Sequence, residues 1–245
     1  MAAFRNSPCI RSIQFVCAVL VCIAVASCSE TKPPVRIAPQ TKFYLLSGPD
    51  YWGDYGHVLI QGYADDREQS NGVLEVSRTG PFMPPITFPR SGEDQIVVTD
   101  EFRKELEAAQ IGRLSFRMVI KKLVVEIPWQ DWDLSAVYPE ELPDSGDPDD
   151  YLDRRHSPQA ADALGDLWQV ILNEGAIVET DIQPETLRGQ ILVHTPTWNG
   201  DAIFWGTDPP DSQFNVRRIV VSDRGKQWLE EHVGKWVHFH EIQAK

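Results

Sequence analysis

Two histidines near the C-terminus have the spacing of metal ligands. His238 and His240 flank Phe239, and alternate residues of a β-strand project from one face, so both imidazoles could reach a single ion. His232 lies a few residues earlier, but no third ligand stands at a recognisable spacing. We therefore favour a solvent-facing strand surface opposite a buried Phe239, and we expect no metal site and no cofactor.

A second group of candidate ligands is acidic. Residues 139–153 read PEELPDSGDPDDYLD, with three prolines and seven acids. Clustered carboxylates suit calcium, but the residue order of an EF-hand loop is absent and Pro148 interrupts the run. We expect residues 139–156 to form an acidic, proline-rich linker or loop between two halves of the protein.

The same loop could instead attract a basic protein partner, because like charges steer an opposite patch toward them. Aromatic residues are enriched at protein interfaces, although tryptophans of this kind more often close the core. The candidate interface residues are Asp144, Asp147, Asp149, Asp150, Trp129 and Trp132.

Motifs of known catalytic sites are missing from the sequence. We find no G-x-S-x-G nucleophile elbow, no P-loop, no H-E-x-x-H zinc motif and no dinucleotide fingerprint. We therefore expect a protein that is not an enzyme.

The N-terminus has the pattern of an export signal. Arg5 and Arg11 precede an apolar run at residues 13–26, which is too short for a comfortable membrane span. The run ends in VASC at residues 25–28, which resembles the bacterial lipobox. This resemblance implies that residues 1–27 are removed and that Cys28 is acylated. Because Ser29 follows rather than aspartate, it also implies an outer-membrane lipoprotein that faces the periplasm.

The mature chain would carry no free thiol, since all four cysteines lie within the first 28 residues. Residues 28–41 contain three prolines and are expected to form a tether. The signal holds two basic residues and no acid, so the mature chain would have 21 basic and 36 acidic residues, a net charge of −15. This charge disfavours nucleic acid and anionic headgroups as partners and favours a basic protein.

Hydrophobic patterning predicts an α+β fold with short, mostly antiparallel strands and about three helices. Helices are expected to begin after Thr99, Ser157 and Ser222 and to reach about Gly112, Gly175 and His232. Residues 42–138 and 157–245 would form the two α+β halves. Strands are expected at residues 43–46, 57–60, 73–76, 96–98, 114–120, 123–127, 191–194, 202–205, 218–221 and 236–242.

An internal repeat supports this division. Residues 96–119 align without a gap to residues 219–242, with seven identities in 24 positions. The identities run through the first strand, the acid after the cap, the helix and the last strand. We expect both segments to form the same strand–helix–strand unit.

The two repeated segments also resemble a known family. IVVSDR followed by a helix and WVHFHEI resembles the C-terminal ending of bacterial immunity proteins of polymorphic toxin systems, and IVVTDEFRKELEAAQIGRLSF looks like the same element. The sequence departs from some members in having a lipobox and no paired CxxC motifs. The resemblance implies a non-enzymatic protein that binds and neutralises a cognate toxin in the periplasm. The alternative is a structural or assembly lipoprotein of an envelope or secretion complex.

Overall fold

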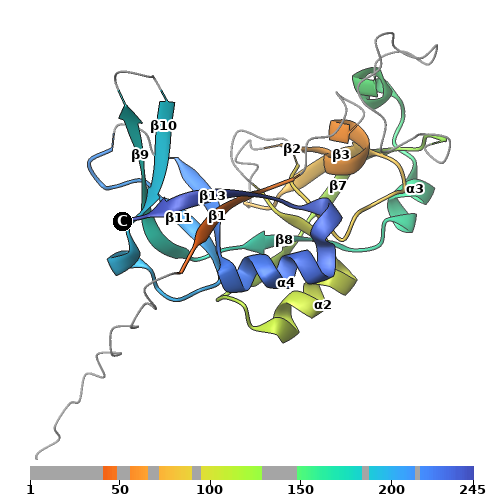
Figure 1. Cartoon of the computed structure of the whole chain (residues 1–245). Coiled ribbons are helices and arrows are strands. Elements are labelled where there is room, and N and C mark those ends of the chain that lie inside the picture. Colours follow the sequence, from red (N-terminus) through yellow and green to blue (C-terminus); the bar gives the residue numbers. More distant parts are fainter. Residues whose placement is uncertain are drawn as a thin grey trace, which may run out of the picture. The chain divides into compact units, whose positions relative to one another are not determined.

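The protein has a mixed α+β fold that is built mostly from short strands (Figure 1). The computed structural model describes residues 41–48, 56–65, 72–89, 95–128, 148–183, 188–212 and 216–245. All of them belong to the unit Val35–Lys245, one of two units into which the chain divides.

The described part of the chain contains three α-helices and several single turns of other helix types. The α-helices are α2 (Asp100–Ala109), α3 (Pro158–Ala163) and α4 (Asp223–Val233), and the turns include a π-helix, η1 (Gly56–Gln61), and a 3₁₀ helix, η3 (Pro148–Asp153). The strands are β1 (Phe43–Ser47), β2 (Tyr63–Asp65), β3 (Glu75–Thr79), β4 (Ile86–Thr87), β5 (Val97–Thr99), β6 (Ser115–Met118), β7 (Ile120–Val125), β8 (Leu167–Ile171), β9 (Glu174–Gln183), β10 (Arg188–Val193), β11 (Ile203–Thr207), β12 (Arg217–Ser222) and β13 (His238–Ala244).

Six strands close into a small barrel in the order β1-β12-β11-β9-β10-β13. Two of its pairings, β9 with β11 and β10 with β13, are parallel, and the others are antiparallel. Its interior is filled by apolar side chains from alternate strand positions. These are Phe43, Ala176, Val178, Val193, Phe204, Val220 and Ile242.

Two further sheets lie outside the barrel. One has the order β2-β3-β7 and the other β4-β5-β8-β6. Strands from before and after residues 139–156 pair in the barrel and in the four-stranded sheet, since β1 pairs with β12 and β5 pairs with β8.

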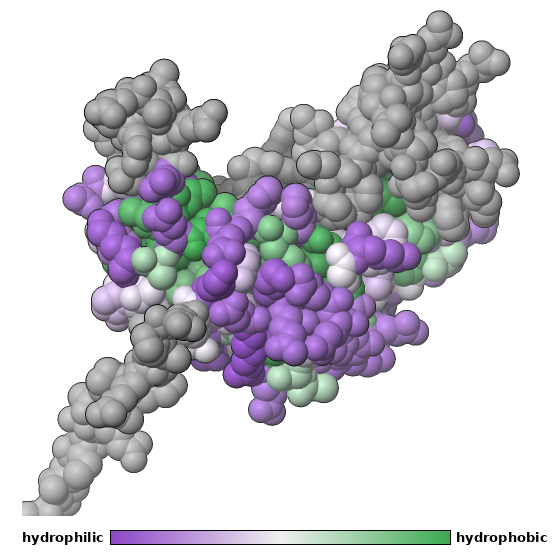
Figure 2. All heavy atoms as spheres, in the orientation of Figure 1, coloured by the Kyte–Doolittle hydropathy of each residue, from purple (hydrophilic) through white to green (hydrophobic). Residues whose placement is uncertain are grey.

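The largest apolar cluster draws on the barrel, on the four-stranded sheet and on helices α2 and α4. Phe102 and Leu106 of α2 and Leu229 and Val233 of α4 are all buried in it. The rings of Phe102 and Trp228 stack at 5.7 Å between centroids. The outward faces of these helices are hydrophilic, as the purple surface over α2 and α4 shows in Figure 2.

Both repeated segments contain a strand, a helix and a strand at matching positions. The first unit is β5-α2-β6 and the second is β12-α4-β13, as the alignment of the two segments requires. The helix starts differ in detail. Thr99 accepts a hydrogen bond from the backbone N–H of Phe102 at 3.3 Å, whereas Ser222 is buried and its side chain caps nothing. The carboxylate of Asp223 instead accepts from the backbone N–H of Lys42 at 2.9 Å.

A strand from elsewhere in the chain lies between the two strands of each unit. In the first unit β8 runs antiparallel to both β5 and β6, and Trp168 stands opposite Val98 on one side and Met118 on the other. The sheet therefore holds two parallel strands with an antiparallel strand inserted between them.

The second unit repeats this arrangement in the same register. Strand β1 lies between β12 and β13, and Tyr44 stands opposite Val221 and Glu241. These two residues are the ones that the sequence alignment matches to Val98 and Met118. Each half of the chain thus supplies the inserted strand of the other half's unit.

The structure corrects one predicted helix. The segment from Ser157 to Gly175 was expected to be a single helix with an apolar face, but α3 ends at Ala163 and β8 follows at Leu167. Gly165 has a φ of 65°, a conformation that glycine adopts without strain, and it turns the chain between the two elements. The cap itself is as predicted, because Ser157 accepts from the N–H of Ala160 at 3.2 Å.

Other local expectations also fail. Residues 57–60 belong to the π-helix η1 rather than to a strand, and the strand expected at residues 73–76 begins at Glu75. The long strand β9 was not predicted. These elements are decided by contacts with distant segments, which periodicity does not record.

Candidate binding cleft at the seam between β10 and β13

The barrel closes weakly between β10 and β13. The two strands are parallel and pair at only two positions, Leu192 with Gln243 and Val193 with Ala244. Before these positions β10 stays paired with β9, and β13 stays paired with β1. Figure 1 shows β10 and β13 diverging away from the C-terminus. Along this opening, residues 188–191 and 238–242 have no strand on their facing edges within the described part of the chain.

A cleft of about 390 Å³ lies in the opening. Leu45 and Ile191 are half-buried there and pack against the apolar filling of the barrel. In Figure 2, green surface interrupts the purple surface in this region. Apolar walls with a few polar groups are the usual composition of a binding site. The lining residues are Leu45, Gln190, Ile191, His240, Glu241, Ile242 and Gln243.

His240 and His238 stand beside each other on one face of β13. Their ring centroids are 4.4 Å apart, and both side chains are exposed. Phe239 lies on the opposite face and packs edge-on against Tyr44 at 6.3 Å. Among the described residues, no group of three His, Cys, Asp or Glu side chains is placed to hold a metal ion. The imidazole of His240 lines the cleft, and an imidazole can donate or accept a hydrogen bond.

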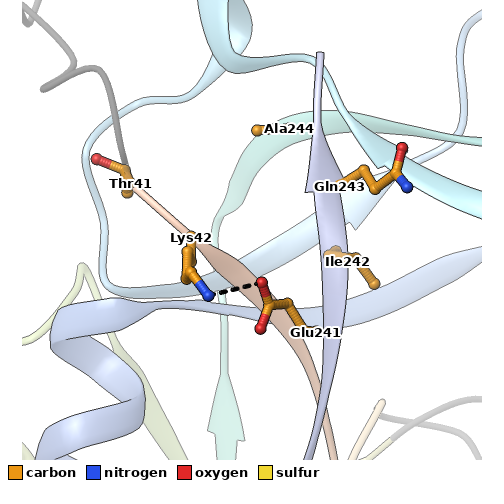
Figure 3. Close-up of a pocket in the computed structure, with 6 residues that line it drawn as sticks. All are labelled: Thr41, Lys42, Glu241, Ile242, Gln243 and Ala244. Atoms are coloured by element: carbon orange, nitrogen blue, oxygen red, sulfur yellow. Dashed lines mark ion pairs between the residues drawn. The ribbon is translucent and has the colours of Figure 1, made fainter.

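A second hollow, of about 490 Å³, lies beside the first where β1 begins. Figure 3 shows Lys42 and Glu241 facing each other across it, with a distance of 2.9 Å between Lys42 Nζ and Glu241 Oε1. The hydrogen bond and charge of Glu241 raise the pKa of Lys42 above its usual value. Glu241 borders both hollows, so it links this ion pair to the cleft at the β10–β13 seam, hereafter the seam cleft.

The structure locates only part of the predicted partner surface. Cys28, Trp129, Trp132, Asp144 and Asp147 lie outside the described residues.

Asp149 and Asp150 belong to η3, and the side chain of Asp150 is exposed. The next residue, Tyr151, is 4% exposed and packs with Leu59 and Val125, which fixes η3 to the body. An exposed Asp150 is compatible with either a partner surface or a solvated loop.

Sequence reasoning singled out one residue of the seam cleft, His240, as a candidate metal ligand, and it favoured a solvent-facing strand surface instead. Leu45 and Ile191 look like ordinary strand residues in the sequence, and only the divergence of β10 from β13 exposes them. One sequence signal pointed to this region, namely the internal repeat. It identified β13 as the last strand of the second unit, which can be compared with the last strand of the first.

A fully buried arginine lies away from the cleft. Arg78 donates to the carbonyl oxygens of Leu59 at 2.6 Å and Phe82 at 2.8 Å. Burial lowers its pKa to about 10, so the guanidinium remains charged at neutral pH. It joins the π-helix η1 to the segment after β3, which is a structural role.

The fold and the cleft thus define a mixed α+β protein with a six-stranded barrel and an open seam. No family model, curated protein or solved structure matches the chain. Within the described residues, no helix is both long and apolar enough to cross a membrane.

Proposed function

We propose that this protein is an envelope lipoprotein of immunity type, which binds and neutralises a cognate toxin without catalysing a reaction. The observation that carries the proposal is the seam cleft. It contains two half-buried aliphatic side chains, Leu45 and Ile191. They lie beside the parts of β10 and β13 that do not pair with each other. Apolar side chains next to unpaired backbone groups are suited to a protein surface, which can satisfy both.

The N-terminal signal supports the location. Acylation of Cys28 would hold the body at the outer membrane, facing the periplasm, where an incoming toxin would meet it. Residues 28–41 would then act as the tether between the lipid and β1.

We also propose that the two strand–helix–strand units are related by duplication. The support is the shared register described above, together with matched apolar fillings. Leu167, Val97 and Val76 pack together in one half, and their counterparts Phe43, Val220 and Val193 pack together in the barrel. The likeness to immunity proteins lies in the same two segments.

The acidic loop is a second candidate contact surface. Asp144, Asp147, Asp149 and Asp150 would steer a basic toxin toward the body, and Trp129 and Trp132 would supply most of the lasting affinity. Replacing the four aspartates by asparagine would then slow association and flatten its salt dependence, whereas a plain linker would leave association kinetics unchanged.

A capture experiment separates the proposed function from its alternative. The mature chain, held in detergent, serves as bait for proteins of the source cell, and each captured protein is then produced in the periplasm of a test strain. We expect a captured toxin whose lethality is relieved by co-production of this lipoprotein. Capture of envelope or secretion components alone, with no relief of toxicity, would instead support the structural or assembly role.

A further inference from the structure

The seam cleft has a counterpart in the other half of the molecule. Strands β6 and β7 of the first unit follow each other directly, and together they correspond to the single strand β13 of the second unit. Strand β7 pairs with β3 in parallel. Ile120 and Lys121 of β7 pair with Glu75 and Val76 of β3. Continued two residues past its end at the same offset, the internal alignment matches Ile120 and Lys121 to Gln243 and Ala244, which make the parallel pairs of the β10–β13 seam.

This first seam is closed by the chain itself. The guanidinium of Arg117 reaches across from β6 and donates to the carbonyl oxygen of Gly72, which lies just before β3. The backbone N–H of Ile120 donates to the carbonyl of Leu74 at 2.9 Å. Leu74 and Val119 of this seam are buried, at 7% and 5% exposed, whereas Ile120 and Met118 are 47% and 52% exposed.

The second seam has the same backbone pairing, since Gln243 pairs with Leu192, but it lacks the arginine bridge. Its residue at the Arg117 position is His240, whose side chain is shorter and exposed. Ile191 stands where Leu74 stands, yet it is only half-buried. The fold therefore does not require an opening here, and the exposed apolar surface is available to another molecule.

The fold also indicates what shape of ligand fits. It twice holds an antiparallel strand between two parallel ones, with β8 between β5 and β6 and with β1 between β12 and β13. Strands β10 and β13 are parallel and diverge. An extended segment between them would be the third case of the same arrangement, and it would pair with the facing edges of both strands.

Charge indicates the chemistry of that segment. The first seam is bridged by a guanidinium that donates to a backbone carbonyl, and the second lacks that cation. The chain carries a net charge of −13, and Glu241, with its side chain 56% exposed, borders the cleft. A basic side chain on the partner would thus meet backbone carbonyl oxygens in the place that Arg117 occupies in the first seam, and Glu241, which pairs with Lys42, lies beside that place.

We propose that the seam cleft binds an extended segment of a protein partner by strand addition between β10 and β13, with an aliphatic side chain against Leu45 and Ile191 and a basic side chain beside His240 and Glu241. This inference rests on the proposed function, since the natural donor of the segment would be the toxin. It adds the site and the mode of binding.

The test begins with linear peptides of random sequence displayed on phage and selected on the mature chain in detergent. We expect selected peptides to combine aliphatic residues with arginine or lysine. Amide hydrogen exchange should then show new protection in residues 188–191 and 238–242 when a selected peptide is bound. Selection of no peptide, or protection confined to other segments, overturns the proposal.

Two matched variants sharpen the result. His240→Arg gives the second seam the cation that closes the first, and we expect it to weaken peptide binding by roughly tenfold or more. Arg117→His makes the reverse change in the first seam and should leave peptide affinity unaltered. His240 is exposed, so the variant should keep the melting temperature of the parent. Equal affinity of the His240→Arg variant and the parent overturns strand addition at this seam.

The same variants distinguish the two proposals. A captured toxin whose binding is unaffected by His240→Arg would retain the immunity function and exclude this site. Peptides that bind the seam, in a protein that relieves no toxicity, would retain the site and exclude the immunity function.

Discussion

The guanidinium carbon of Arg103 lies 4.6 Å from the ring centroid of Trp168, and Lys226 makes the equivalent contact with Tyr44 at 5.5 Å. Each cation comes from the helix of one unit, and each ring comes from the strand inserted into that unit. Both cations also pair with a glutamate four residues later, Arg103 with Glu107 and Lys226 with Glu230. The likeness of the two units therefore extends to side-chain contacts between segments distant in sequence.

Replacing Arg103 by alanine should lower the free energy of unfolding more than Lys104→Ala does, because it removes the contact with Trp168 and the pairs with Asp100 and Glu107. Urea denaturation measures the change. Lys104→Ala is the matched control, since Lys104 is exposed and pairs with Asp100 alone. Equal effects of the two substitutions would show that the ring contact contributes nothing.

Gly225→Ala should destabilise the protein although alanine favours helices. The α-helix α4 passes so close to the start of β11 that a Cβ at position 225 would overlap the carbonyl oxygen of Ala202. Relieving such an overlap costs about 1–3 kcal/mol, more than the helix propensity of roughly 1 kcal/mol that alanine gains over glycine. Gly234→Ala is the control, because a Cβ there meets no atom within 4 Å, and it should be neutral or stabilising. A stable Gly225→Ala variant would contradict the close approach.

Asp208 should make stability depend on acid pH. Burial tends to raise its pKa, but hydrogen bonds from the Val216 N–H and Arg218, together with the charge of Arg218, outweigh burial and leave the pKa below its usual value. A lowered carboxylate pKa stabilises the folded state above the unfolded pKa of about 3.9, and this contribution disappears as pH falls through the folded pKa. Asp208→Asn should cost about 1–3 kcal/mol at pH 7 and much less in strong acid. Melting temperatures across this range, with the exposed Asp211→Asn as control, provide the test; a difference that persists in acid would contradict it.

Arg78→Met should destabilise the protein by about 3–5 kcal/mol, because the buried carbonyl groups of Leu59 and Phe82 would lose their donor. Arg78→Lys should also be costly, since one ammonium does not reproduce the spread of a guanidinium fork. Denaturation of both variants, beside the exposed Arg155→Lys, measures the effect. A stable Arg78→Met variant would show that η1 does not depend on this guanidinium.

Cys28→Ser should release the protein from membranes if Cys28 carries the lipid, as the lipobox-like tetrapeptide at residues 25–28 predicts. Mass spectrometry of the parent should find residues 1–27 removed and Cys28 lipid-modified. An unmodified Cys28, or a serine variant still held in membranes, would contradict the prediction.

The sequence by itself determined the elements whose signals are local. Short apolar runs placed β1 and β5, and Thr99 with two acids after it placed the start of α2. The internal repeat predicted where α4 begins, even though the side chain of Ser222 does not cap this helix. These features depend on propensity and capping within a few residues, which any reader of the sequence can see.

The tertiary structure decided between helix and strand in segments whose local residue pattern suits either one. Leu164, Trp168 and Ile171 have helical spacing, but Trp168 and Ile171 form β8 because that segment completes the first unit between β5 and β6. Residues 57–60 are apolar enough for a strand, but they form part of η1, and the carbonyl groups of Leu59 and Ile60 accept from the buried Arg78. The seam cleft is likewise invisible in the sequence. It exists because β10 stays paired with β9 and β13 stays paired with β1, so that β10 and β13 pair with each other only near their C-terminal ends. Such long-range pairing leaves no trace in local periodicity.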